Sequence, residues 1–374
     1  GTNTLGYGNS HVDEAVSSVV RKGNMSTFNC PEEVELAEKL IELHPWGDMV
    51  RFARSGGEAN SIAVRIARAA SGRDKVAICG YHGWHDWYIS TNLGDNDGLD
   101  GHLLPGLEPA GVPRSLKGTT IPFTYNDLEE ITQLVKSNPD LGVIKMEVTR
   151  NMGPKDGYLE GIRKLCDENN IVLIFDECTS GFRETYGGIH LKYGVEPDMC
   201  MFGKALGNGY AITAVLGKRE IMEAAQKTFI SSTFWTERIG PSAAVATLEE
   251  MKRIKSWEII TAQGKKIQEG WKKLARENDL ELKCAGIPAL STYSIESENW
   301  LKYKTFITQE MLKKGWLAGS SVYVCIGHTD SVIENYLNEL NPIFKTISDF
   351  EKSQRDISEV LEGPISHGGF KRLN

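Results

Sequence analysis

The chain has 374 residues, of which 42 are basic and 50 acidic, so its formal net charge is −8. This balance argues against a protein that binds nucleic acid or another polyanion. Aliphatic runs are short and interrupted by charge, and the opening residues GTNTLGYGNSH contain no apolar stretch. We therefore expect neither a membrane span nor a signal peptide. The seven cysteines are scattered without CxxC spacing, which predicts a reduced, cytoplasmic protein.

The first two thirds of the sequence alternate between strand and helix patterns. We expect helices over residues 11–21, 31–43, 56–70, 127–136 and 159–169, and strands over 49–53, 75–79, 142–148, 171–175, 199–202 and 212–217. Residues 92–118 are rich in Gly, Pro and Leu without a clear period, which indicates a long functional loop. Strands that alternate with helices from about residue 48 to 217 predict an α/β fold with a mostly parallel, doubly wound sheet.

The last third of the sequence predicts a smaller α+β region. After Pro241 a long helix is expected to run to about Asn278. A strand over residues 289–295, a helix over 305–314, a strand over 323–327 and a helix over 329–350 should follow. We therefore divide the chain into an N-terminal helical segment (1–47), a large α/β domain (48–241) and a linking helix with a small C-terminal domain (242–374).

The stretch from Ile171 to Gly209 holds the strongest candidates for chemistry. An apolar strand ends in Asp176 and Glu177, and a second apolar strand leads into Gly203 and Lys204. Parallel sheets place their chemistry at the carboxyl ends of their strands. An acid and a lysine there suit a cofactor that needs a covalent amine on one side and an anion under a ring nitrogen on the other. Pyridoxal 5'-phosphate (PLP) has both needs.

Each of these two residues also has a simpler interpretation. Most lysines are solvated, so Lys204 taken alone is more simply a loop lysine. Asp176 would equally cap the following turn or pair with Arg183. An unpaired buried carboxylate is costly, however, and a pyridinium nitrogen would supply the missing partner. Taken together, Asp176 and Lys204 favour the catalytic interpretation.

A second candidate feature opens the helix after the first strand. Ser55, Gly56 and Gly57 stand at a helix N-terminus, where free N–H groups and the helix dipole bind phosphate. The same pattern fits an ordinary capping box of Ser55 and Glu58. Local sequence does not separate these alternatives.

Aromatic and hydroxyl side chains supply the remaining candidates. Tyr81 and His82 follow a strand, and an aromatic ring there could stack on a planar cofactor. His82, His85 and Asp86 match no standard zinc spacing, so we expect no metal. The hydroxyls of residues 231–236 would bind phosphate or simply form a turn.

These motifs together resemble the class III aminotransferases of PLP fold type I, and most closely the glutamate-1-semialdehyde aminomutase branch. The resemblance covers nearly the whole chain. The matching segments are Phe175-Asp176-Glu177 with Ser180-Gly181-Phe182-Arg183, Gly203-Lys204, Ser55-Gly56-Gly57-Glu58-Ala59, Tyr81-His82-Gly83, Glu147 with Asn151, and Ser232-Thr233-Phe234. The chain departs from the family where Gly57 replaces a hydroxyl residue, and where the aminomutase branch carries a gating Glu, since no Glu lies near Ser320.

The resemblance implies a role for each matching residue. Lys204 would be the Schiff-base lysine, and Asp176 would pair with the ring nitrogen. Ser55, Gly56 and Gly57 would hold the phosphate together with Thr233 from a neighbouring subunit, which implies a homodimer with shared sites. Tyr81 and His82 would lie at the ring, and Asn151 at the ring hydroxyl.

The implied activity is PLP-dependent movement of an amino group between a small-molecule donor and a carbonyl acceptor, by a transaminase or an aminomutase. A racemase, epimerase or decarboxylase on the same scaffold is the alternative among enzymes. A relative that keeps the fold without turnover is the alternative outside them.

Overall fold

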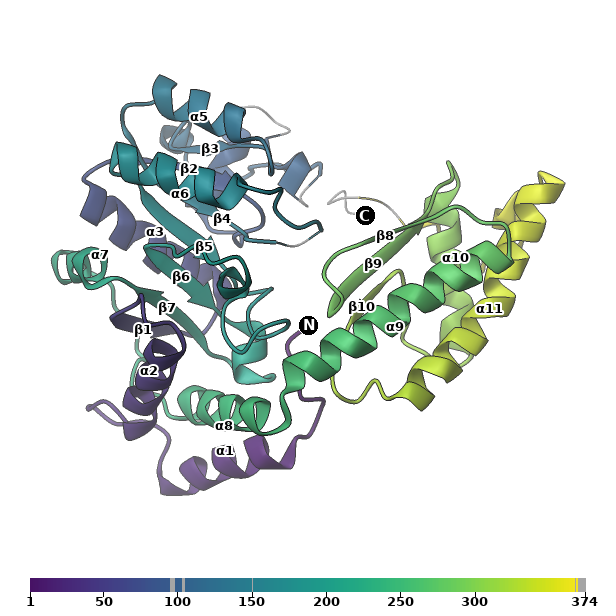
Figure 1. Ribbon diagram of the computed structural model, residues 1–374, viewed down its shortest axis with the longest axis horizontal. Helices are drawn as coiled ribbons and strands as arrows, with labels where there is room; N and C mark the ends of the chain where they lie inside the picture. Colours follow the sequence, from purple (N-terminus) through teal and green to yellow (C-terminus); the bar gives the residue numbers. More distant parts are fainter. Residues whose placement is uncertain (95–97, 103–104, 150, 367, 369–374) are drawn as a thin grey trace.

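The computed structural model describes residues 1–94, 98–102, 105–149, 151–366 and 368 of the chain. Figure 1 shows two lobes, a larger one around a seven-stranded sheet and a smaller one around a three-stranded sheet. The N-terminus lies between the two lobes. The residue boundaries 47/48 and 241/242 that we assign to domains stay predictions.

The large sheet is mostly parallel, which confirms the predicted α/β fold. Its strands are β1 (Met49–Ala53), β2 (Lys75–Cys79), β3 (Thr120–Pro122), β4 (Leu141–Met146), β5 (Val172–Asp176), β6 (Met199–Phe202) and β7 (Thr213–Gly217). They lie in the order β1-β7-β6-β5-β4-β2-β3. β7 runs antiparallel to both of its neighbours, and the pairs among β2 to β6 are parallel. β1 therefore points the same way as β6, and the carboxyl ends of β1, β2, β4, β5 and β6 share one edge.

Alternate strand residues point to opposite sides of this sheet, and both sides carry apolar residues. Helices therefore cover both faces. The helices of the large lobe are α1 (Ser10–Lys22), α2 (Pro31–Leu43), α3 (Gly56–Ser71), α4 (Asp86–Ile89), α5 (Leu128–Ser137), α6 (Tyr158–Asn169), α7 (Arg219–Met222) and α8 (Ile239–Ile254). Strand residues such as Ile174 and Met201 pack with α3 on one face. Leu173 and Phe175 pack with α5, α6 and α8 on the other.

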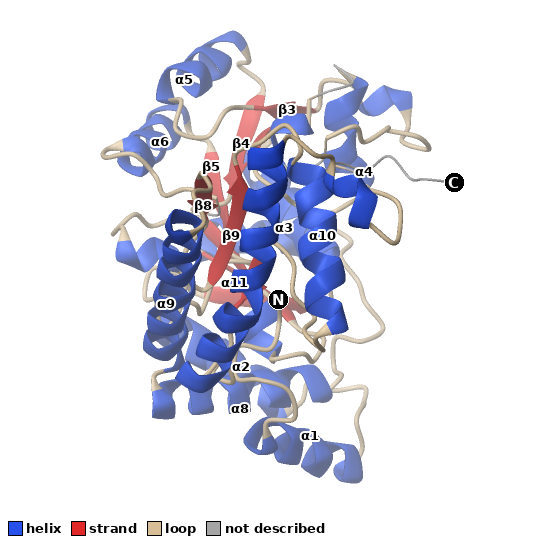
Figure 2. Cartoon of the chain, turned by 90° about the vertical axis from the view of Figure 1, so that its right-hand side faces the viewer, coloured by secondary structure: helices blue, strands red, loops and turns tan. Residues whose placement is uncertain are grey.

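The small lobe is an antiparallel sheet backed by long helices. Its strands β8 (Leu282–Ala285), β9 (Leu290–Ile295) and β10 (Ser321–Tyr323) lie in the order β10-β9-β8. The helices α9 (Ser256–Glu277), α10 (Trp300–Lys313) and α11 (Asp330–Ser353) stand in front of this sheet in Figure 2. A separate apolar core joins the sheet to these helices.

Several predicted elements differ from the observed ones. The prediction of a single long helix after Pro241 is wrong, because the structure has two helices there. Lys255 adopts a left-handed conformation (φ 52°) that ends α8 and lets α9 start in a new direction. The short strands β3 and β8 were not predicted, since three or four residues carry little periodicity. Within the expected loop 92–118 lie the short helical turns η2 (Asp100–His102) and η3 (Arg114–Leu116). Residues 95–97 and 103–104 of that loop lie outside the described residues.

The first residues of the chain connect the two lobes. The backbone N–H of Leu5 donates to Asn208 Oδ1 over 2.9 Å, and Asn3 Nδ2 donates to the carbonyl of Asn208 over 3.0 Å. Asn208 directly follows the turn η5 (Lys204–Gly207) of the large lobe. The carbonyl of Thr4 accepts a hydrogen bond from the N–H of Ile326, just after β10 of the small lobe. One short segment therefore contacts both the loop that carries Lys204 and the small lobe.

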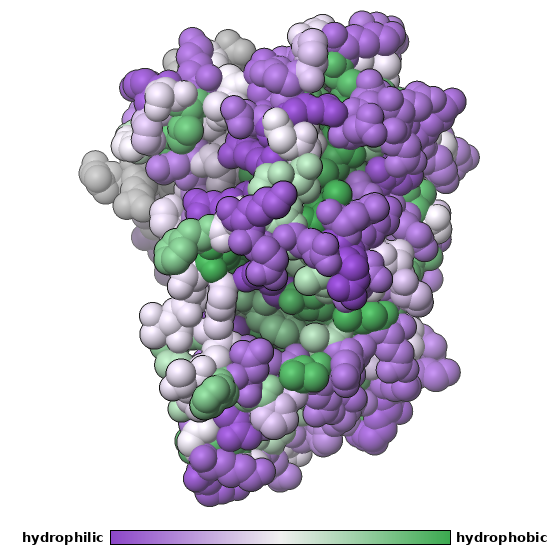
Figure 3. Space-filling view, turned by 90° about the vertical axis from the view of Figure 1, so that its left-hand side faces the viewer, coloured by the Kyte–Doolittle hydropathy of each residue, from purple (hydrophilic) through white to green (hydrophobic). Residues whose placement is uncertain are grey.

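In the described part of the chain, no helix combines the length and the apolar character needed to cross a bilayer. The face of the large lobe turned away from the small lobe is mostly hydrophilic, with hydrophobic residues confined to limited patches (Figure 3).

Candidate active site

The predicted acid, Asp176, is the last residue of β5, and its side chain is only 4% exposed. Its Oδ2 lies 2.9 Å from His82 Nδ1 and 3.8 Å from Lys145 Nζ. Its Oδ1 accepts a hydrogen bond of 3.2 Å from the N–H of Cys178. Arg183 instead donates to the carbonyls of Thr179 and Gly1, so the alternative pairing of Asp176 with Arg183 is not what the structure contains.

These neighbours keep Asp176 ionised. Burial by itself raises the pKa of this carboxyl group, but the charge of Lys145 and the hydrogen bonds from His82 and Cys178 hold its pKa well below the usual range. Burial also lowers the pKa of His82 to about 4, so this imidazole is neutral at pH 7. An ionised carboxylate only accepts hydrogen bonds, so His82 donates from Nδ1. Its Nε2 is buried, with no hydrogen-bond partner among the residues that the structure describes.

The predicted Schiff-base lysine begins the turn after β6. Lys204 has a φ of 44°, a left-handed backbone that is uncommon outside glycine. Such strained residues concentrate at functional sites. Its Nζ donates a hydrogen bond of 2.6 Å to Thr179 Oγ1, in the loop that follows Asp176. The structure therefore brings the predicted lysine and the predicted acid to neighbouring strand ends.

The predicted phosphate-binding residues stand at the start of α3, on the same edge of the sheet. Ser55 is the N-cap, and its Oγ accepts a hydrogen bond of 3.4 Å from the N–H of Glu58. The N–H groups of Gly56 and Gly57 belong to the first turn, where no helical carbonyl can accept them. A Cβ placed on Gly56 would meet nothing within 4 Å, whereas one placed on Gly57 would come within 3.0 Å of His85 Nε2. The capping and phosphate-binding interpretations are thus compatible.

The aromatic loop packs directly against this helix start. Gly83 has a φ of 98°, and a Cβ placed on it would come within 3.1 Å of the Gly57 Cα. The backbone N–H of Tyr81 donates to Glu147 Oε2 over 3.0 Å, which fixes the loop to the end of β4. The loop of Tyr81, His82 and Gly83 therefore runs from Glu147 after β4, past the carboxylate of Asp176, to the start of α3.

The other two predicted residues lie further out. Asn151 is exposed, and it lines a cavity of about 290 Å³ together with Gly80, His102 and Glu147. Thr233 is also exposed, in the turn before α8. Arg54, which precedes Ser55, donates a hydrogen bond of 2.6 Å to the carbonyl of Phe234, so this turn lies near the start of α3. The cluster of His82, His85 and Asp86 is not assembled as a ligand set, because His82 faces Asp176 while His85 Nδ1 contacts Ser61 Oγ at 2.6 Å.

Sequence reasoning missed two residues of this site. Thr179 gives no local signal, because its contact with Lys204 depends on how two strand ends come together. Lys145 does give a signal, since it is a charged residue inside the apolar run of β4. A lysine in the middle of a buried strand is a feature that sequence inspection can find.

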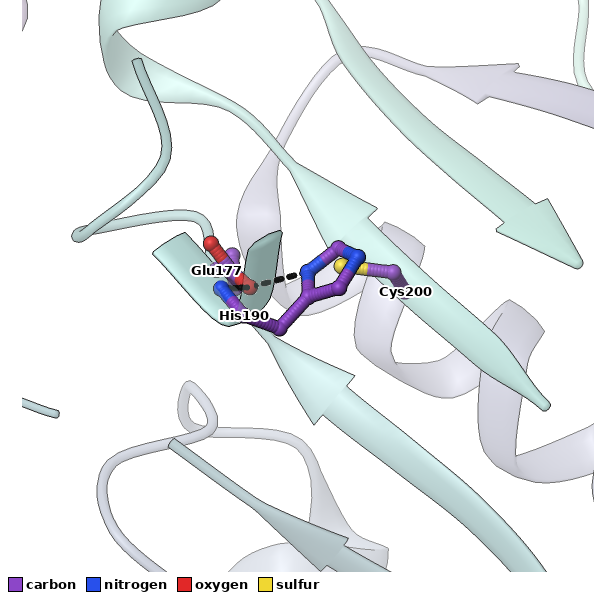
Figure 4. A group of neighbouring side chains, drawn as sticks. All are labelled: Glu177, His190 and Cys200. Atoms are coloured by element: carbon purple, nitrogen blue, oxygen red, sulfur yellow. Dashed lines mark hydrogen bonds and ion pairs between the residues drawn. The ribbon is translucent and has the colours of Figure 1, made fainter. Parts of the chain in front are cut away.

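A buried cluster of Glu177, His190 and Cys200 lies beside the site (Figure 4). Trp46 Nε1, which can only donate, contacts His190 Nε2 at 3.0 Å, so the ring proton of His190 sits on Nδ1 and is donated to Glu177 over 2.6 Å. Glu177 also accepts the backbone N–H groups of Ile189 and His190. With both imidazole nitrogens engaged, the cluster acts as a structural connection from β5 to the loop before β6.

We expect Glu177→Gln to destabilise the protein by about 3–5 kcal/mol, because an amide would place N–H groups against buried donors in place of a charged acceptor. The midpoint of urea denaturation measures this loss. The matched control is Glu277→Gln at the exposed end of α9, where Lys273 lies 3.8 Å away and a change within about 0.5 kcal/mol is expected. Equal stability of both variants would contradict the structural role of Glu177.

The fold and this site define a class of protein. Solved structures with the same fold include the Sphingopyxis sp. MTA144 FumI protein in a form carrying PLP, with a TM-score of 0.85 and 24% identity, covering 94% of this chain and 84% of that one. An ω-transaminase from Sphaerobacter thermophilus has a TM-score of 0.82 and 20% identity, covering 92% and 85%. The chain has the α/β architecture of the PLP enzymes of fold type I.

Sequence comparison places the chain in a particular family. Residues 1–323 match class-III aminotransferases. The chain is 32% identical over 344 residues to a 3-aminobutyryl-CoA aminotransferase of Cloacimonas acidaminovorans, covering 87% of this chain and 78% of that protein. It is 30% identical over 375 residues to a glutamate-1-semialdehyde 2,1-aminomutase of Methanocaldococcus jannaschii, covering 92% and 85%. The chain belongs to the class-III aminotransferase family, whose members transfer amino groups with PLP.

The residues present fit this cofactor. A lysine amine, an ionised buried carboxylate and an open helix start all lie along one edge of the sheet. These are the groups that an aldehyde, a ring nitrogen and a phosphate require.

Proposed function

We propose that Lys204 and Asp176 carry amino transfer in this chain. The observation that supports this most directly is their placement: the Lys204 amine is held by Thr179, three residues beyond the buried, ionised Asp176. We further propose that Ser55, Gly56 and Gly57 bind the cofactor phosphate, that Tyr81 and His82 contact the ring, and that Asn151 contacts the ring hydroxyl.

When bound, PLP supplies an electron-withdrawing ring that accepts the electrons of a broken C–H bond. The Asp176 carboxylate is fixed by the N–H of Cys178 and by His82, and it would hold negative charge against the ring nitrogen of a bound cofactor. Lys204 Nζ would hold the aldehyde end of the cofactor, and the same amine would act as the base that moves a proton during amino transfer. Thr179 Oγ1 orients that amine.

We propose a homodimer in which Thr233 of one subunit reaches the phosphate site of the other. Support comes from the exposed apolar side chains near this turn: Phe234 is 53% exposed, Phe28 81% and Phe229 88%. The β-bridge between Met25 and Glu237 places residues 25–28 beside the turn. A second copy covering this surface would remove these side chains from water. We also propose a cytoplasmic location, which the seven free cysteines support.

The experiment that tests this function maps the position of the cofactor. The purified protein is incubated with PLP, treated with borohydride, digested and analysed by mass spectrometry. Borohydride fixes a cofactor held by a lysine amine, so the added mass should lie on the peptide that contains Lys204. A cofactor mass on another lysine, or on none, would contradict the proposal.

The same preparation separates amino transfer from the other activities of this scaffold. An amino donor added without an acceptor should yield about one equivalent of carbonyl product per site. A racemase or decarboxylase would return no such carbonyl product.

A further inference from the structure

Lys145 is a fully buried lysine in the middle of a strand of the large sheet. Its strand neighbours in register are Ile78 on β2 and Ile174 on β5. The side chain therefore points to the α3 face, together with Asp176 and Met201. Its exposed fraction is 0%. Alternation along the strands predicts an apolar residue at this position.

The charged end of Lys145 is directed at the carboxylate of Asp176. Nζ lies 3.8 Å from Asp176 Oδ2 and 2.9 Å from Met201 Sδ. Burial lowers the pKa of the Lys145 amine, and the charge of the Asp176 carboxylate raises it. As a cation, Lys145 joins the His82 imidazole and the N–H of Cys178 as the third neighbour that favours the ionised form of Asp176.

The stability of the sheet does not explain this ion pair. Burying two charges costs several kcal/mol, and replacing such a pair by well-packed apolar residues is often neutral or stabilising. An isoleucine or methionine at position 145 would match Ile78 and Ile174. The lysine is therefore better explained by what it does to Asp176 than by what it does for the sheet.

We propose that Lys145 sets the charge balance at the ring-nitrogen position of the site. The positive charge of Lys145 partly neutralises the Asp176 carboxylate. Asp176 therefore stabilises the proton on the cofactor ring nitrogen less strongly. Lys145 is thus a positioning residue that acts through Asp176. This inference rests on the proposed role of Asp176, and it adds that the ring nitrogen loses its proton more readily here than it would beside an uncompensated carboxylate.

Other titratable groups surround this pair on each packed element. They are His82 after β2, Glu147 after β4, Asp176 and Cys178 at and after β5, and Cys200 on β6. Burial keeps the His82 imidazole neutral and raises the pKa of both thiols. With His82 neutral, Lys145 is the cation that pairs with Asp176 among the described residues.

The test uses PLP labelled with nitrogen-15 in the ring and bound to the full-length protein. The nitrogen chemical shift reports whether the ring nitrogen is protonated, so a pH titration gives its protonation equilibrium without measuring turnover. Lys145→Met should favour the protonated ring by at least about tenfold, which is one pKa unit. Lys145→Gln should shift it in the same direction, because the charge and not the shape is the cause.

Lys75→Met provides the matched control, since Lys75 starts β2 with a partly exposed side chain 3.0 Å from Asp140. Its ring-nitrogen titration should equal that of the wild type. Identical titrations in the wild type and both Lys145 variants would overturn the inference while leaving the proposed function intact. A wild type that does not bind PLP would refute the proposed function and, with it, this inference.

A second measurement examines the ion pair in the cofactor-free protein. Lys145→Met and Asp176→Asn should each lower the urea midpoint, and the double variant should lose less than the sum of the two. Additive losses would overturn the inference.

Discussion

Lys204→Ala is expected to lower the rate of amino transfer by about ten-thousand-fold, because the variant loses both the amine that binds the cofactor and the base that moves the proton. Turnover of an amino donor by the PLP-saturated protein measures the loss. Lys204→Arg should be equally inactive, since a guanidinium stays protonated at every accessible pH.

The matched control for Lys204 is Lys164 on α6, whose side chain is 75% exposed. Lys164→Ala should keep the wild-type rate. A Lys204→Ala variant with near-normal turnover would show that another amine performs the chemistry, and the assignment of the site would then fail.

Asp176→Asn is expected to lower turnover by about a hundred- to a thousand-fold, the usual cost of removing a preorganised charged group from a reaction centre. Asparagine has the shape of aspartate but carries no charge, so it cannot stabilise a proton on the ring nitrogen. Since the pKa of Asp176 lies below its usual range, the carboxylate is ionised throughout the neutral region, and the loss should not depend on pH there.

The rate of Asp176→Asn should be measured at saturating PLP, so that weaker cofactor binding is not mistaken for slower chemistry. Asp279→Asn serves as the control, since Asp279 is 73% exposed and pairs only with Lys352 among the ion pairs of the described residues. A loss of turnover that addition of more PLP fully restores would assign Asp176 to binding alone.

The sequence allowed the sheet to be predicted because its strands are short apolar runs bounded by turn residues. The strand 171–175 and the observed β5 differ by a single position at each end. The broken helix at Lys255 was not predictable, because the left-handed residue there is a lysine that carries no local breaker signal. β3 and β8 depend on their partners for stability and not on their own composition.

The site was predictable where function leaves local motifs. Asp176, Lys204 and Ser55 each end or begin an element, and topology brings such ends together. The contacts of Lys204 with Thr179 and of Asp176 with His82 depend on side-chain directions across strands, which sequence spacing does not give. The roles of Asn151 and Thr233 stay predictions, because they concern a bound cofactor and a second subunit.

The N-terminal segment gives the molecule a mechanical property. Asn3 and Leu5 are hydrogen-bonded to Asn208, four residues beyond Lys204. Thr4, between them, is hydrogen-bonded to Ile326 of the small lobe. Because these hydrogen bonds alternate between the two lobes along three consecutive residues, the segment links the lobes directly. If the small lobe moves while these hydrogen bonds persist, the loop that carries Lys204 must move with it. The position of the small lobe and the position of the Lys204 amine are therefore coupled.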